Sequence, residues 1–276
     1  MKNLIKTFLT VFIIITLPTI TTQAADKYSK EYLQSKNHVS ITKPFAESIV
    51  KKAIKKALKK ETGVNFDVKF SGYTTASIKK GIFKSLELTG YDVDIDSIPI
   101  PYINLKTLSD YNYIDYTKNP IEYKSDINLS YNLLLSEDSI NSALKQNKYQ
   151  KTIKNVNKIA YPLFVINNVK TKIMKDKMYI AVDYNFPISK SSKDKTFVMI
   201  SDFQVINGEI KAKNVHIDSA YGNIPLNKVT NLVNLLNPLE FTLKALDDKK
   251  CEGNIENVNI IDNKIKVDGK IFIKGD

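Results

Sequence analysis

The stretch from Thr42 to Gly63 restricts the possible folds more than any other part of the chain. Apolar residues recur there every three or four positions, the spacing that places side chains on one side of an α-helix. Thr42 is a suitable N-cap, and Gly63 stands where a glycine commonly ends a helix. The pattern predicts one amphipathic helix, whose apolar stripe contains Phe45, Ile49, Val50, Ala53, Ile54, Ala57 and Leu58.

Directly after Gly63 the hydrophobic period changes from that of a helix to that of a strand. Val64, Phe66, Val68 and Phe70 alternate with polar residues, which indicates a strand with one apolar face. The helix and the strand each need a cover for this face, and the pattern leaves open whether protein or lipid provides it.

The remaining chain alternates between one-sided strands and a few amphipathic helices. Residues 127–135 form the clearest strand, and Ser136 opens a helical stretch that we expect to break near Asn147. Asn207-Gly208 predicts a tight hairpin, with a bulge near Lys213-Asn214 where the apolar parity changes. We therefore expect an α+β fold with one long, curved, mainly antiparallel sheet whose apolar side lies on two or three helices.

Several connecting segments are expected between these elements. Residues 26–41 are polar and read as a mobile lead-in, whereas Ile98-Pro99-Ile100-Pro101 reads as a sheet edge or connector because proline cannot donate to a ladder. A loop rich in tyrosine is expected at 109–120, and a short helix at 225–236.

The first 25 residues have the order of a secretory signal. Two lysines precede an apolar run from Phe8 to Leu17, and small residues follow at Ala24 and Ala25. The run is too short to span a bilayer, which needs about 20 apolar residues. We expect residues 1–25 to be removed and residues 26–276 to form a single elongated, soluble domain that is periplasmic or secreted. Cys251 is the only cysteine, which excludes an internal disulfide.

The net charge of +12 comes entirely from lysine, because all 41 basic residues are lysine and none is arginine. Arginine is the residue that reads base edges and phosphates in bidentate fashion, so the composition argues against a nucleic-acid partner. Lysines near an anionic lipid surface still contribute about 1 kcal/mol each. Peripheral contact with an anionic membrane is therefore expected at Lys51, Lys52, Lys55, Lys56 and Lys59.

A search for catalytic chemistry finds little in this sequence. His38 and His216 are the only histidines, and neither stands in a nucleophile, phosphate-loop or zinc motif. Asp92, Asp94 and Asp96 share one side of a strand, but they lack the glycine turn of a calcium loop and read as a solvated face. We expect no enzymatic activity, no cofactor and no metal site.

Two functions fit the surplus of apolar faces. The first is the binding of an acyl-chain ligand in an apolar groove, by a protein that carries or senses it. The alternative is an envelope interaction module with a core filled by its own side chains, which binds a protein through a sheet edge or the tyrosine loop. Periodicity places the candidate lipid contacts at Ile49, Ile54, Leu58, Leu129, Leu133, Phe197, Met199 and Phe203.

The order of several short motifs resembles the LmeA-like family of exported phospholipid-binding proteins. After the helix and its strand comes GIFKSLEL at 81–88, then SEDSI at 136–140, NPLEF at 237–241 and VDG at 267–269. The resemblance implies a phospholipid-binding envelope protein rather than an enzyme. It also implies a tubular architecture, in which a strongly curved sheet wraps the long N-terminal helix. The tyrosine-rich stretch at 109–120 and the absence of arginine depart from the family pattern.

Overall fold

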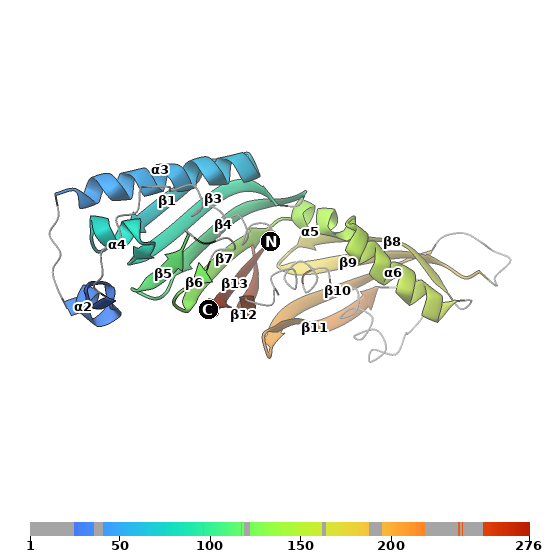
Figure 1. Cartoon of the computed structure of the whole chain (residues 1–276). Helices are drawn as coiled ribbons and strands as arrows, with labels where there is room; N and C mark the ends of the chain where they lie inside the picture. Colours follow the sequence, from blue (N-terminus) through green and yellow to red (C-terminus); the bar gives the residue numbers. More distant parts are fainter. Residues whose placement is uncertain are drawn as a thin grey trace.

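The computed structural model of the chain describes residues 25–35, 41–95, 97–116, 118, 122–161, 164–187, 195–218, 237, 239 and 251–276. The fold is α+β with mainly antiparallel sheets, as the sequence predicts, and Figure 1 shows an elongated arrangement. The helices are η2 (Ala25–Tyr28, a 3₁₀ turn), α2 (Lys30–Ser35), α3 (Lys43–Thr62), α4 (Thr75–Lys79), α5 (Glu137–Leu144) and α6 (Asn147–Ala160). The expected signal at 1–25 lies almost wholly outside the described residues, and the expected helix at 225–236 lies wholly outside them.

The described strands form three sheets instead of the single long sheet that was expected. The largest has the order β1 (Phe66–Ser71), β3 (Ser85–Ile95), β4 (Ile98–Thr107), β7 (Ile127–Leu135), β13 (Lys264–Ile273) and β12 (Cys251–Ile261). The second has the order β11 (Glu209–Asp218), β10 (Lys195–Ile206), β9 (Lys177–Asn185) and β8 (Val165–Met174). The third contains β2 (Ile82–Phe83), β5 (Asn112–Asp115) and β6 (Glu122–Tyr123).

The division into sheets arises where β7 ends and the chain turns into α5. The Ser136 side chain accepts a hydrogen bond from the Ser139 amide, and the Ser139 side chain accepts one from the Ser136 amide, so a capping box starts the helix at this point. α5 then packs against β4, β7 and β8, while β12 contacts β10 and β11. The two larger sheets therefore adjoin without sharing a ladder.

The helix predicted between Thr42 and Gly63 is confirmed as α3, and it ends as expected. Gly63 has a φ of 77°, and its amide donates to the Lys59 carbonyl at 2.9 Å, a left-handed ending that glycine adopts without strain. α3 packs along β1, with further contacts to α4 and β3, and Figure 1 shows it at this margin of the sheet. The side chains that it buries are Ala46, Val50, Ile54, Ala57 and Leu58.

The apolar stripe of α3 is narrower than the sequence pattern indicates. Phe45 is 72% exposed and Ile49 is 36% exposed, so neither belongs to the buried face. The reason is that α3 lies at the edge of the six-stranded sheet, where β1 covers only the sector around Val50 and Ile54.

Other local predictions are confirmed. The helical stretch after Ser136 breaks into α5 and α6, and Asn207-Gly208 forms a hairpin turn with both φ angles positive. Strands β10 and β11 shift register between Ile200 and Asp202, opposite the bulge expected near Lys213-Asn214. Pro99 and Pro101 lie in β4 where only β3 is paired with it, because β7 joins from Tyr102 onwards.

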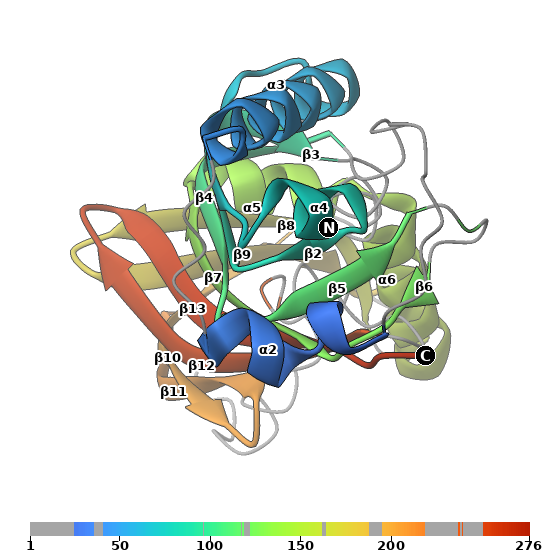
Figure 2. The ribbon, with the colours of Figure 1, turned by 60° about the vertical axis from the view of Figure 1, so that its left-hand side comes forward.

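The expectation of a mobile lead-in at 26–41 is wrong for the part that the structure describes. η2 and α2 lie at one end of the molecule, beside α4 and the three-stranded sheet (Figures 1 and 2). Leu33 of α2 is 1% exposed and packs with Tyr73 and Ile82. Tyr111 and Tyr113 join this cluster, so these two tyrosines of the expected loop pack into the protein. Sequence periodicity misses the contact because the two segments are distant in the chain.

Candidate functional site

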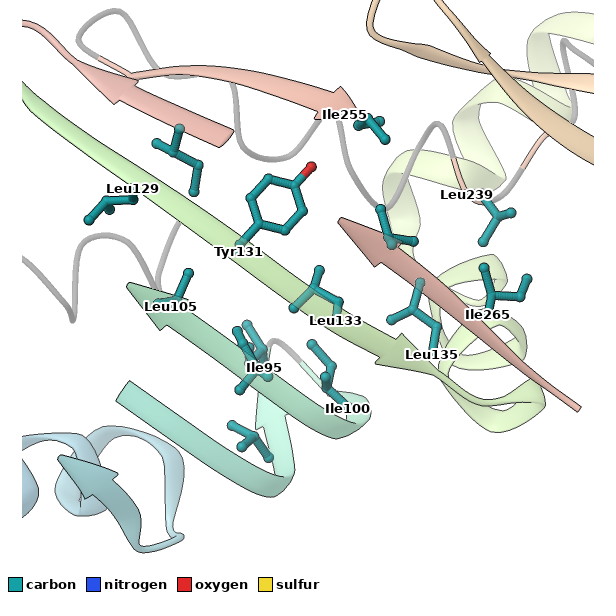
Figure 3. Packing of buried hydrophobic residues seen from close by; sticks show 14 of the residues in the cluster. Ile95, Ile100, Leu105, Leu129, Tyr131, Leu133, Leu135, Leu239, Ile255 and Ile265 are labelled. Carbon is teal, nitrogen blue, oxygen red and sulfur yellow. The ribbon is translucent and has the colours of Figure 1, made fainter. Parts of the chain in front are cut away.

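The interior face of the six-stranded sheet is an extensive apolar surface. Every second residue of β7, from Ile127 to Leu135, is buried. β13 contributes the facing row from Ile265 to Ile273, and the register aligns Leu133 with Val267 and Tyr131 with Gly269. Figure 3 shows Leu129, Tyr131, Leu133 and Leu135 along one side of β7. This face is part of a single apolar cluster that extends into the four-stranded sheet.

The opposite face of the same sheet carries the polar groups. Lys69 and Glu87 approach to 3.5 Å, and the Asn104 side chain donates to Glu87 at 3.2 Å and to Thr89 at 2.9 Å. Asn132 donates to Asp268 further along the row. Among the described residues, no charged side chain is buried. The sheet therefore separates a charged outer surface from an uncharged interior.

Tyr131 places one polar atom on this interior face. Its side chain is 3% exposed, and its hydroxyl has no hydrogen-bond partner among the described residues. Figure 3 shows the phenol oxygen directed away from β7, towards the side where Ile255 of β12 lies. Burial raises the pKa of Tyr131, with smaller contributions from Asp268 and Glu256, so the phenol stays protonated and can donate.

Gly269 makes room for the Tyr131 ring. A Cβ atom at residue 269 would lie 2.5 Å from both Cζ and Oη of Tyr131, and would also strike the Asn254 carbonyl oxygen. Opposite Gly269, β12 shifts register between Ile255 and Asn257, which leaves Glu256 as the extra residue of a bulge. A glycine and a bulge thus flank the phenol on neighbouring strands.

The predicted lipid contacts do not gather at one place. Leu129 and Leu133 flank Tyr131 on β7, whereas Ile54 and Leu58 lie on α3, which packs along β1. The other candidates are in the four-stranded sheet, where Phe197 and Met199 are buried and Phe203 is half-buried. Ile49 lies on the outer surface of α3. The shared cluster contains all of these residues except Ile49.

The alternation of apolar and polar residues in 127–135 puts Tyr131 on the apolar side of this strand, but nothing in the sequence singles it out. The available signal was a lone hydroxyl in a row of leucine and isoleucine. Its position opposite a glycine required the pairing of β7 with β13, which only the structure supplies.

The outer surface of α3 is a second candidate region. Lys52, Lys55, Lys56 and Lys59 are exposed there, and Lys51 is half-buried. Lys55 reaches Asp67 of β1 at 3.7 Å, with both side chains about half exposed, so this ion pair is weak. Phe45 and Ile49 share the surface with the lysines.

The free edge of β8 is closed by side chains from α5 and α6. Asn141 donates to the Thr171 carbonyl at 3.0 Å and accepts from the Thr171 amide at 2.9 Å. Asn157 does the same for Ile166, at 2.9 and 2.8 Å, and Glu137 accepts from the Ile173 amide at 3.3 Å. These contacts occupy groups that an added strand would need, so β8 is protected against edge pairing.

Metal-binding residue types do not cluster in the described part of the chain. No group of three or more His, Cys, Asp and Glu side chains gathers there to hold a metal ion. Asp92, Asp94 and His216 are exposed, while Asp96 and His38 lie outside the described residues. Among the described helices, none combines the length and apolar character that a membrane-spanning segment requires.

No protein-family model matches this chain, and neither does any curated protein or solved structure. The similarity to the LmeA-like family therefore stays a prediction.

Proposed function

We propose that this protein is an exported, non-enzymatic carrier or sensor that binds a phospholipid or another acyl-chain ligand against the interior face of the six-stranded sheet. The observation that carries the proposal is the Tyr131 hydroxyl, which is buried without a partner among the described residues on a mostly apolar sheet face, where the hydroxyl of the neighbouring Thr107 is paired with Leu86. A buried donor without an acceptor costs about 1–3 kcal/mol. A ligand that brings both an apolar chain and an acceptor oxygen offsets this cost.

The side chains around Tyr131 indicate which class of ligand this sheet face would bind. Leu129 and Leu133 flank the phenol on β7, and Leu105 lies on the neighbouring strand β4, so the surroundings favour a hydrocarbon chain. The phenol remains protonated and donates one hydrogen bond, which suits an ester carbonyl or a carboxyl group. Since no charged side chain is buried in the described interior, a charged headgroup would stay near the surface.

The tubular architecture implied by the resemblance is part of the same proposal. Two features support a strongly curved sheet: the bulge at Glu256 in β12 and the positive φ of 50° at Asp92 in β3. After Asp92, the buried residues of β3 change from even to odd positions. Both features bend a strand. α3, packed along β1, is the helix that such a sheet would wrap.

Native mass spectrometry of the protein isolated from the envelope of its own host tests this function. We expect a stoichiometric lipid that leaves only on denaturation, with the organic extract identifying its headgroup. Tyr131→Phe is the informative variant, because it keeps the ring and removes only the hydroxyl, and it should retain less of the same lipid. A bare mass in repeated preparations of the unaltered protein would refute the proposal and favour the interaction module.

A further inference from the structure

The solvent side of α3 begins with a ridge of exposed apolar side chains. Ile41, just before the helix, is 98% exposed, and Phe45 and Ile49 follow at intervals of four residues. Residues four apart lie above one another on a helix, so Phe45 and Ile49 form one row, and the exposed Ile41 stands in the turn that leads into it. The row faces away from the buried sector around Val50 and Ile54.

Lysines continue the same row over the next turns of the helix. Lys52, Lys56 and Lys59 follow Ile49 at intervals of three or four residues and are exposed. They form no ion pair with any other residue that the structure describes. One side of α3 therefore carries apolar groups at its first turns and uncompensated positive charge along the rest.

We propose that this face of α3 docks on an anionic membrane surface. The lysine turns lie on the lipid headgroups, and Ile41, Phe45 and Ile49 enter the boundary between headgroups and acyl chains. Helices that bind in a membrane interface also combine lysine with bulky apolar residues, on opposite faces, whereas on α3 the two kinds follow one another along one exposed face. An anionic membrane complements the positive charge of this face, because surfaces rich in anionic lipid attract clustered lysine side chains.

A protein partner fits this face less well. Cores of protein interfaces are depleted in lysine, and their dominant contacts come from tryptophan, tyrosine and arginine. The row on α3 contains none of these three residue types. Lysine, as a flexible point charge, suits a fluid surface of headgroups better than a fixed set of acceptors.

The inference goes beyond the proposed lipid binding, because it concerns the membrane surface on which the protein docks and not the ligand that it binds in its interior. The protein isolated from its host envelope is mixed with vesicles of phosphatidylcholine alone or of phosphatidylcholine with phosphatidylglycerol, and binding is measured by cosedimentation. We expect binding to the anionic vesicles, weakened by salt.

Two variants separate the charge from the apolar contribution. Replacing Lys52, Lys56 and Lys59 together by Gln should weaken binding on the order of 100-fold, since each lysine contributes about a fivefold factor. Phe45→Ser should weaken it by about tenfold or more, because the inserted ring is lost. Both sites are exposed, so thermal unfolding should be unchanged and serves as the folding check.

The matched control alters the same charge on another helix. Lys151, Lys154 and Lys158 of α6 are exposed, and their joint replacement by Gln should leave vesicle binding nearly unchanged. An equal loss in this control would overturn the inference, because the effect would then be one of net charge. Equal binding to neutral vesicles would also overturn it, and so would α3 variants that bind like the unaltered protein. Stoichiometric lipid in the native mass spectrum would still stand in each of these cases.

Discussion

Tyr131 and Gly269 face each other across β7 and β13, and they show how one pair of residues can mark a site. The glycine has no role in a turn here, since its value lies in the space that it leaves for the phenol ring. The ring in turn brings a hydroxyl into an interior where leucine would pack without cost. Packing alone does not explain a tyrosine at this position, and the proposed ligand would give its hydroxyl an acceptor.

Removing that hydroxyl should have opposite effects on stability and on ligand retention. In protein freed of lipid, Tyr131→Phe should raise the free energy of unfolding by about 1–2 kcal/mol, because a desolvated donor without a partner disappears. Urea denaturation measures this change. Tyr149 is the control, because it is as deeply buried but interacts with a neighbouring group, so Tyr149→Phe should not stabilise the protein. Destabilisation by Tyr131→Phe would mean that the hydroxyl is already satisfied.

At the scale of elements, side-chain amides from α5 and α6 form hydrogen bonds with the backbone of β8 and so protect the edge of the four-stranded sheet. Asn141 and Asn157 each offer one donor and one acceptor to a single strand residue, which is the arrangement that a neighbouring strand would provide. An unprotected edge is a template for aggregation. The two asparagines thus replace a fifth strand in the four-stranded sheet.

Asn141→Leu and Asn157→Leu should each destabilise the protein by about 1–3 kcal/mol, because strand amides and carbonyls lose their partners. Both variants should also aggregate more readily on warming, as light scattering during thermal unfolding would record. Asn155→Leu on the exposed side of α6 is the control and should leave the unfolding temperature nearly unchanged. Similar behaviour of all three variants would mean that the edge contacts contribute nothing.

At the scale of the whole molecule, buried tyrosines link stability to alkaline pH. Burial, helped by Asp110 and Tyr111, raises the pKa of Tyr73 to about 12, and burial also raises those of Tyr131 and Tyr149. These phenols bind their protons more tightly in the folded state than in the unfolded chain. The stability that they contribute is therefore complete below about pH 10, the pKa of an unfolded tyrosine, and is lost above it.

We expect the unfolding temperature to stay level from neutral pH to about pH 10 and then to fall, with the Tyr73 contribution lost by about pH 12. Circular dichroism over a pH series measures the fall, and Tyr73→Phe should make it shallower. An unfolding temperature that does not change across this window would contradict the raised pKa values.

Much of the local structure could be predicted because its signals are local. The period of α3, the left-handed glycine at its end, the Asn207-Gly208 turn and the bulge opposite Ile200 each depend on neighbouring residues. The candidate site was harder to predict from the sequence. Alternation placed Leu129 and Leu133 on the interior face, but it also grouped them with Phe197 and Met199, which belong to another sheet.

The sequence by itself determined where α3, α5 and the most regular strands begin, which face of most strands is apolar, and that lysine supplies all the positive charge. Tertiary structure alone decided that the strands divide into separate sheets, that Tyr111 and Tyr113 pack into the cluster around Leu33 of α2, and that Phe45 points to solvent. The physical reason is the same in each case. Periodicity states that a face is apolar, but the partner that covers it comes from a distant part of the chain. Only the packing of α3 at the edge of the sheet leaves Phe45 uncovered, and only the pairing of β7 with β13 sets Tyr131 over a glycine.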